Sequence, residues 1–158
     1  MNCIAAFRSF KSTSDPSMIP EEPSDIYTLP GCENLQIIRQ LSDAKFPVYL
    51  VSYLPTGQEF AMKIFPWEND SPTSFFLNEV RFAQFCHPNI IPIVYYDYEQ
   101  EACIAGESLK ISYLLMEFAK YGDLFDVLIT AKIPLTEVLV RTYFHQVIKG
   151  IEYIHKKK

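Results

Sequence analysis

Residues 59–65 read EFAMKIF, and this short stretch decides how the chain around it folds. Phe60, Met62 and Ile64 alternate with Ala61 and Lys63, which is the pattern of a β-strand with two different faces. Burying the ammonium group of a lysine is expensive unless a carboxylate or a phosphate compensates its charge. Lys63 is therefore either an edge lysine that extends to water or a residue with a specific anionic partner, and the stretch alone favours neither.

The sequence on both sides of this strand predicts an antiparallel sheet. Residues 35–41 and 47–54 are rich in β-branched and aromatic side chains, and the Thr-Gly pair at 56–57 marks a tight turn. These two runs and 59–65 predict a meander of three strands. Residues 90–99 and 109–118 have the same composition and predict two further strands.

Three other stretches have the spacing of helices. Residues 71–86 begin with Ser and Thr, which cap helices well, and 122–129 predict a short helix. Residues 135–158 form a strongly amphipathic helix, with the apolar stripe Val140, Phe144, Val147, Ile151 and Ile154. The order predicts an α+β fold, in which one helix lies on a five-stranded antiparallel sheet that leads into a helical region.

Composition limits the function classes. The chain has 158 residues with 49% hydrophobic content, enough for one core, and its net charge of −5 excludes a global basic field for nucleic acid or membrane. Four prolines among polar residues predict a flexible leader over 1–34. There is no signal-peptide core and no membrane-length apolar run, so we expect a soluble, cytoplasmic protein. The cysteines form no CxxC pair, which predicts reduced thiols and no metal cage; they are Cys3, Cys32, Cys86 and Cys103.

Five motifs in order resemble a eukaryotic protein kinase domain of the serine/threonine type. FAMKIF (60–65) resembles the family's V-A-I-K strand, and NEV (78–80) resembles the start of its αC helix. HPNII (87–91) is similar to the turn after αC, and LLMEFAKYGDLFDVL (114–128) to the hinge and the next helix. RTYFHQVIKGIEYIH (141–155) is similar to the helix before the catalytic loop. The resemblance implies a partial kinase domain over 35–158, with an N-lobe to 116, a hinge at 117–122 and the start of a C-lobe from 123.

The resemblance also implies a site for ATP. Lys63 would pair with the α- and β-phosphates and be held by Glu79, and Met116 would be the gatekeeper. The backbones of Glu117 and Ala119 would bind adenine, and Asp123 would bind a ribose hydroxyl or cap a helix. The residues that would cover the adenine ring are Leu41, Val48 and Ala61. A protein substrate or partner protein is implied as well.

Two features depart from the family pattern. LSDAKFPV (41–48) stands where the family has G-x-G-x-x-G-x-V, with Ser42, Ala44 and Pro47 at glycine positions, which predicts a weak grip on phosphates. Family spacing counted back from His87 points to Asn78 as the partner of Lys63, one residue or about 100° of helix from Glu79. We favour Glu79, because a buried lysine needs a charged partner.

The sequence contains neither H-R-D nor D-F-G, the motifs that hold the catalytic base and the Mg²⁺ ligands in this family. Mg²⁺ is expected for the family, but its ligands are absent here, and so we expect the 158-residue chain alone to be inactive. Three interpretations stay open. The chain is part of a serine/threonine kinase domain, a pseudokinase-type interaction module with weak or no nucleotide binding, or a remnant that does not fold independently.

Overall fold

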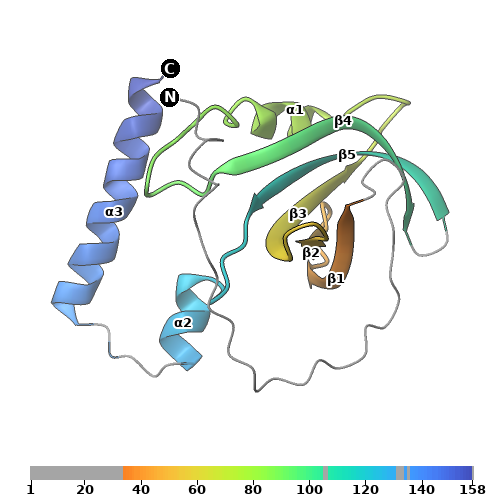
Figure 1. Cartoon of the computed structure of the whole chain (residues 1–158). Coiled ribbons are helices and arrows are strands. Elements are labelled where there is room, and N and C mark those ends of the chain that lie inside the picture. Colours follow the sequence, from red (N-terminus) through yellow and green to blue (C-terminus); the bar gives the residue numbers. More distant parts are fainter. Residues whose placement is uncertain (1–33, 105–106, 131–133, 135, 158) are drawn as a thin grey trace.

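The computed structural model describes residues 34–104, 107–130, 134 and 136–157 (Figure 1). The flexible leader predicted for 1–34 lies outside these residues except for Asn34, so it stays a prediction. Everything that follows concerns the part of the chain that the structure describes.

Five antiparallel strands form one sheet, as predicted. They are β1 (Leu35–Ser42), β2 (Val48–Tyr53), β3 (Gln58–Pro66), β4 (Ile93–Ile104) and β5 (Glu107–Glu117). Their order in the sheet is β1-β2-β3-β5-β4, so β3 lies at the centre. Gly57, with φ of 68°, makes the tight turn between β2 and β3, where its N–H donates to the carbonyl of Tyr53 at 2.8 Å.

Three helices accompany the sheet: α1 (Ser74–Val80), α2 (Leu124–Thr130) and α3 (Glu137–Lys156). The predicted α+β fold, with a five-stranded antiparallel sheet followed by helices, is therefore confirmed. The helix predicted over 71–86 is shorter than expected. After α1 the chain continues in turns closed by three-residue hydrogen bonds, such as Phe82 N–H to the Glu79 carbonyl at 3.0 Å. Phe85 lies in these turns and is buried, with its ring 5.3 Å from that of Phe82 and 5.7 Å from that of Tyr153.

The two faces of β3 contribute to two separate cores. Phe60, Met62 and Ile64 point into the larger core, and Met62 and Ile64 are completely buried. Each such side chain contributes about 1.5–3 kcal/mol through burial. Phe65 points to the opposite face, where it joins Phe76 of α1 in the smaller core. Because side chains alternate along a strand, Ala61 and Lys63 share the face of Phe65, as the sequence predicts.

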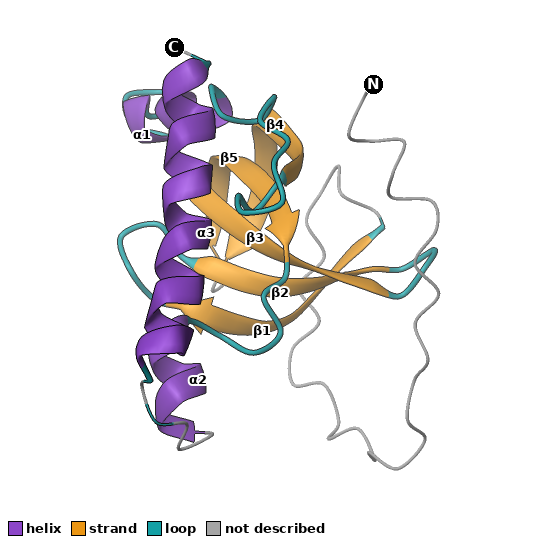
Figure 2. Ribbon diagram, turned by 90° about the vertical axis from the view of Figure 1, so that its left-hand side faces the viewer, coloured by secondary structure: helices purple, strands orange, loops and turns teal. Residues whose placement is uncertain are grey.

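Helix α3 runs along the side of the molecule, in front of the sheet in the view of Figure 2. Tyr153 attaches it to the segment after α1: its hydroxyl accepts the Cys86 N–H at 3.2 Å, and its ring lies 5.0 Å from that of His87. Gly150 is buried against the same segment. None of the described helices is long and apolar enough to cross a membrane.

The expectation of reduced thiols is wrong for Cys86, which is disulfide-bonded in the structure. Spacing in the sequence could not show this, because two cysteines pair according to their distance in the folded chain and not along it.

Candidate functional site

Lys63 is paired with a carboxylate from another element. Its Nζ atom, on β3, lies 2.5 Å from Oε1 of Glu79 on α1. The Lys63 side chain is 24% exposed and that of Glu79 is 37% exposed, so the pair is partly shielded from water. Asn78, the alternative from family spacing, is exposed. The strand lysine thus has the charged partner that its burial requires.

The position of Glu79 depends on how α1 is fixed to the sheet. Thr73 caps the helix, because its side-chain oxygen accepts the N–H of Phe76 at 3.3 Å. Phe76 is fully buried, and its ring lies 5.5 Å from that of Phe65 on β3 and 5.4 Å from that of Tyr98 on β4. The side chain of Phe76 therefore holds the helix at the distance at which Glu79 reaches Lys63.

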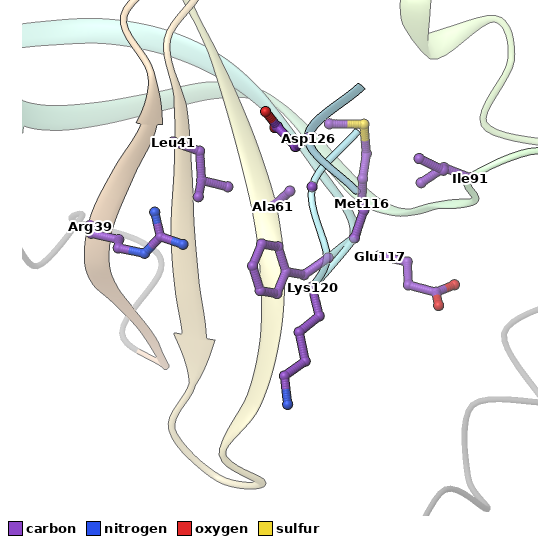
Figure 3. Close-up of a pocket in the computed structure, with 11 residues that line it drawn as sticks. Arg39, Leu41, Ala61, Ile91, Met116, Glu117, Lys120 and Asp126 are labelled. Carbon is purple, nitrogen blue, oxygen red and sulfur yellow. The ribbon is translucent and has the colours of Figure 1, made fainter. Parts of the chain in front are cut away.

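A cavity of about 370 Å³ opens beside this pair, between β1, β3 and the segment that follows β5 (Figure 3). Its lining includes five residues that the family resemblance implied: Leu41, Ala61, Met116, Glu117 and Ala119. Six others were not anticipated: Arg39, Ile91, Phe118, Lys120, Gly122 and Asp126. Ala61 is small and lies among larger apolar residues of the lining, an arrangement that leaves room for a flat ring.

Four residues expected at the site do not line the cavity. Val48 lies opposite Lys63 in the β2–β3 register, and neither these two residues nor Glu79 is among those that line the cavity. Asp123 caps α2 instead, since its Oδ1 atom accepts the N–H of Asp126 at 2.8 Å. Asp126, three positions further along the chain, lines the cavity in its place, and Glu117 is the other acidic residue of the lining.

Some of the missed residues carried a signal in the sequence. Arg39 is two positions before Leu41 on β1, so strand alternation places both on one face. Gly122 has φ of 75°, and a Cβ there would lie 3.0 Å from Oδ2 of Asp126. A glycine just before a helix hints at such a conformation. Ile91 had no local signal, because only the fold brings it to the cavity.

The loop between β1 and β2 closes onto the aromatic side chains near Lys63. The ring of Phe46 is half-buried and lies 4.9 Å from that of Phe65 and 5.1 Å from that of Phe75. Lys45 Nζ lies 4.9 Å from the centre of the Phe75 ring and 3.5 Å from Oε1 of Glu68. The glycine-free loop is thus packed against β3 and α1.

The site offers an apolar slot for a flat ring and a lysine held by a carboxylate. Within the described residues, no group of three or more His, Cys, Asp or Glu side chains is placed to hold a metal ion.

Comparison with known proteins shows which family this chain is similar to. The protein kinase domain model matches residues 45–158. The chain is 32% identical to CBL-interacting protein kinase 26 of Oryza sativa subsp. japonica, over 79% of this chain and 24% of that protein. It is 30% identical to an SNF-related serine/threonine-protein kinase of Rattus norvegicus, over 69% of this chain and 14% of that protein.

A third relative, the serine/threonine-protein kinase dst2 of Dictyostelium discoideum, is 25% identical over 89% of this chain and 11% of its own length. The chain thus spans about a quarter or less of the length of these curated relatives. The family model covers most of the chain, and the fold is consistent with it. This chain belongs to the protein kinase domain family.

Proposed function

We propose that this chain carries the adenine-nucleotide site of a serine/threonine protein kinase. The observation that carries the proposal is the pair of Lys63 and Glu79 beside a cavity lined by Ala61 and Met116. Lys63 would neutralise phosphate oxygens of ATP, and Glu79 would hold the ammonium group in place. The pairing supports this role, because a lysine fixed by a carboxylate needs no reorganisation when phosphate arrives.

The adenine ring would occupy the cavity. Leu41 and Ala61 would cover one face of the ring, Met116 would lie at its inner end, and the backbones of Glu117 and Ala119 would bind its edge. The carbonyl of Ala119 already accepts the Gly122 N–H at 3.0 Å, which gives this segment a defined turn. Val48 would cover the far end of the ligand. Asp123 would bind a ribose hydroxyl through Oδ2, because its Oδ1 atom accepts the Asp126 N–H in the cap of α2.

The family reaction is phosphoryl transfer from ATP to serine or threonine of a protein substrate, and we propose it for the protein as a whole, in the cytoplasm. The division into an N-lobe at 35–116, a hinge at 117–122 and the start of a C-lobe at 123–158 is part of this proposal.

The 158-residue sequence contains no catalytic aspartate motif and no D-F-G. We therefore expect this chain alone to transfer no phosphate, and measurable transfer of radiolabel from ATP to a generic protein substrate would contradict that.

Titration of ATP into the 158-residue chain by calorimetry tests the proposed site. We expect weak binding that Lys63→Met weakens further, since the substitution removes the charge but keeps an apolar side chain of similar length. Lys110→Met is the matched control, because Lys110 lies at an exposed position where its ammonium group contacts Asp70 at 3.2 Å. Equal ATP affinity in the wild type and Lys63→Met would remove Lys63 from the site.

A second candidate function is a pseudokinase-type module that binds a partner protein. The loop at 42–47 favours it, because glycines are absent and Phe46 packs where the family keeps a mobile loop. ATP binding requires the nucleotide site around Lys63, whereas binding of a partner protein by the module does not. Partner binding that Lys63→Met leaves unchanged, together with no ATP binding, would favour the module.

A further inference from the structure

Glu79 lies in the last turn of a short helix. α1 spans only Ser74–Val80, so Glu79 is its last residue but one. The carbonyl groups in the last turn of a helix have no partner within it, and such a turn opens easily unless the residues that follow bind these groups. Phe76 and the cap at Thr73 fix the beginning of the helix. The position of Glu79 therefore depends on the residues that follow α1.

A row of backbone hydrogen bonds leads from Glu79 to α3. The carbonyl of Glu79 accepts the N–H of Phe82 at 3.0 Å, and the carbonyl of Phe82 accepts the N–H of Phe85 at 2.9 Å. These three-residue turns are tighter than the turns of an α-helix. The next N–H along the chain, that of Cys86, donates to the hydroxyl of Tyr153 at 3.2 Å. Tyr153 thus binds the end of the row that begins at Glu79.

Aromatic rings follow the same course. Phe85 is buried, and its ring lies edge to face with that of Phe82 at 5.3 Å and with that of Tyr153 at 5.7 Å. Such pairs have a preferred geometry, so they restrict the movement of one ring relative to the other. The ring of His87 lies 5.0 Å from that of Tyr153 as well. The turns between α1 and α3 are therefore held both by their backbone and by their side chains.

Tyr153 belongs to a continuous contact face on α3. Gln146, Gly150 and Tyr153 are spaced four and three positions apart, which places them on one side of the helix. The Asn89 side chain donates to Oε1 of Gln146 at 3.4 Å, and Gly150 is buried against the backbone of Asn89. Helix α3 thus contacts the segment after α1 over about two turns, and this gives Tyr153 a fixed base.

We propose that Tyr153 is a positioning residue for the Lys63–Glu79 pair, and through that pair for the phosphates of ATP. The inference rests on the proposed function, in which Lys63 binds phosphate and Glu79 holds its ammonium group. Without Tyr153 the row of hydrogen bonds ends at Cys86, so the last turn of α1 opens more often and Glu79 leaves Lys63. A lysine that is no longer held must be ordered when ATP binds, and this lowers the affinity for ATP.

Adenosine provides the contrast that separates positioning from a general loss of structure. It carries no phosphate, and the lining of the cavity that would take its ring includes neither Lys63, Glu79 nor Tyr153. Loss of the position of Glu79 therefore weakens the binding of ATP and leaves the binding of adenosine unchanged, whereas partial unfolding weakens both.

Titration of ATP and of adenosine into the 158-residue chain by calorimetry tests the proposal. Tyr153→Ala should lower the affinity for ATP about threefold to tenfold and keep that for adenosine within about twofold. Tyr153→Phe keeps the ring contacts and loses the hydroxyl, so its loss for ATP should be smaller, about twofold to threefold. Phe144→Ala removes an exposed aromatic ring from the same helix and should change neither affinity.

The same substitution in the Lys63→Met background shows whether Tyr153 acts through the ion pair. Once Lys63 is gone, Tyr153→Ala should cause no further loss of ATP affinity. A loss of the same size in both backgrounds, an equal loss for ATP and adenosine, or an unchanged ATP affinity overturns the inference and leaves the proposed function intact. Where the alanine variant does not fold, Tyr153→Phe decides by the same comparisons. No binding of ATP to the wild type overturns the proposed function and this inference with it.

Discussion

Lys63 of β3 and Glu79 of α1 lie sixteen positions apart in the sequence, and their charged atoms lie 2.5 Å apart in the structure. The strand provides a lysine on the face that carries Ala61, and the helix is held over that face by the buried ring of Phe76. The pair therefore depends on a helix cap, on aromatic packing and on a strand register. Each of these can be changed separately.

Replacing Glu79 with Gln should destabilise the chain, because it leaves Lys63 without a negative partner at about the same side-chain volume. Both side chains are partly exposed, so we expect the free energy of unfolding to fall by only about 1 kcal/mol. Asn78→Ala is the matched control at the neighbouring exposed position and should stay within about 0.5 kcal/mol of the wild type. Urea unfolding measures both, and a larger loss in Asn78→Ala would show that the register of α1 differs from the one described.

Thr73→Ala should loosen α1 at its first turn. The side-chain oxygen of Thr73 accepts the Phe76 N–H, and loss of such a cap costs about 1 kcal/mol. Thr73→Ser keeps the oxygen and should retain most of the stability. Hydrogen exchange of residues 74–80 provides the readout. Equal protection in Thr73→Ala and Thr73→Ser would mean that the packing of Phe76 alone holds the helix.

Gly150→Ala should weaken the contact between α3 and the segment after α1. A Cβ at Gly150 would lie 3.0 Å from the backbone oxygen of Asn89, in the segment whose Cys86 N–H donates to Tyr153 of the same helix. Overpacking costs about 1–3 kcal/mol, whereas alanine gains only about 0.5–1 kcal/mol in a helix, so we expect a net loss of stability. Lys149→Ala, at the exposed neighbour, is the control. Thermal unfolding tests the difference, and a stabilised Gly150→Ala variant would contradict the packing described.

The 158-residue chain should associate through α3. In the structure Phe144 and the other large apolar residues of this helix surface are exposed, namely Val140, Val147, Ile148 and Ile151. Each forgoes on the order of 1.5–3 kcal/mol of burial, and a continuous apolar stripe promotes association.

Phe144→Glu should shift sedimentation velocity toward the monomer, because it places a charge within the stripe. His145→Glu adds the same charge at the neighbouring exposed position and serves as the control. A wild-type chain that sediments as a stable monomer would contradict the association.

The sequence by itself determined the β-structure and the face on which the lysine lies. Alternation along 59–65 separates Phe60, Met62 and Ile64 from Ala61 and Lys63, because successive side chains of a strand point to opposite faces. That local geometry holds whatever the rest of the chain does. The Gly57 turn and the Thr73 cap were also readable, since a left-handed turn and a helix start each require particular residue types.

Only the tertiary structure decided which residues meet. Family spacing pointed to Asn78 and the charge of Lys63 favoured Glu79; in the structure Glu79 contacts Lys63, through a rotation of α1 about its axis that the burial of Phe76 sets. The same holds for Phe46, because no local pattern shows that a loop aromatic packs between Phe65 and Phe75. Long-range contacts depend on how separate elements share buried surface, and this is a property of the packed molecule and not of any one stretch of its sequence.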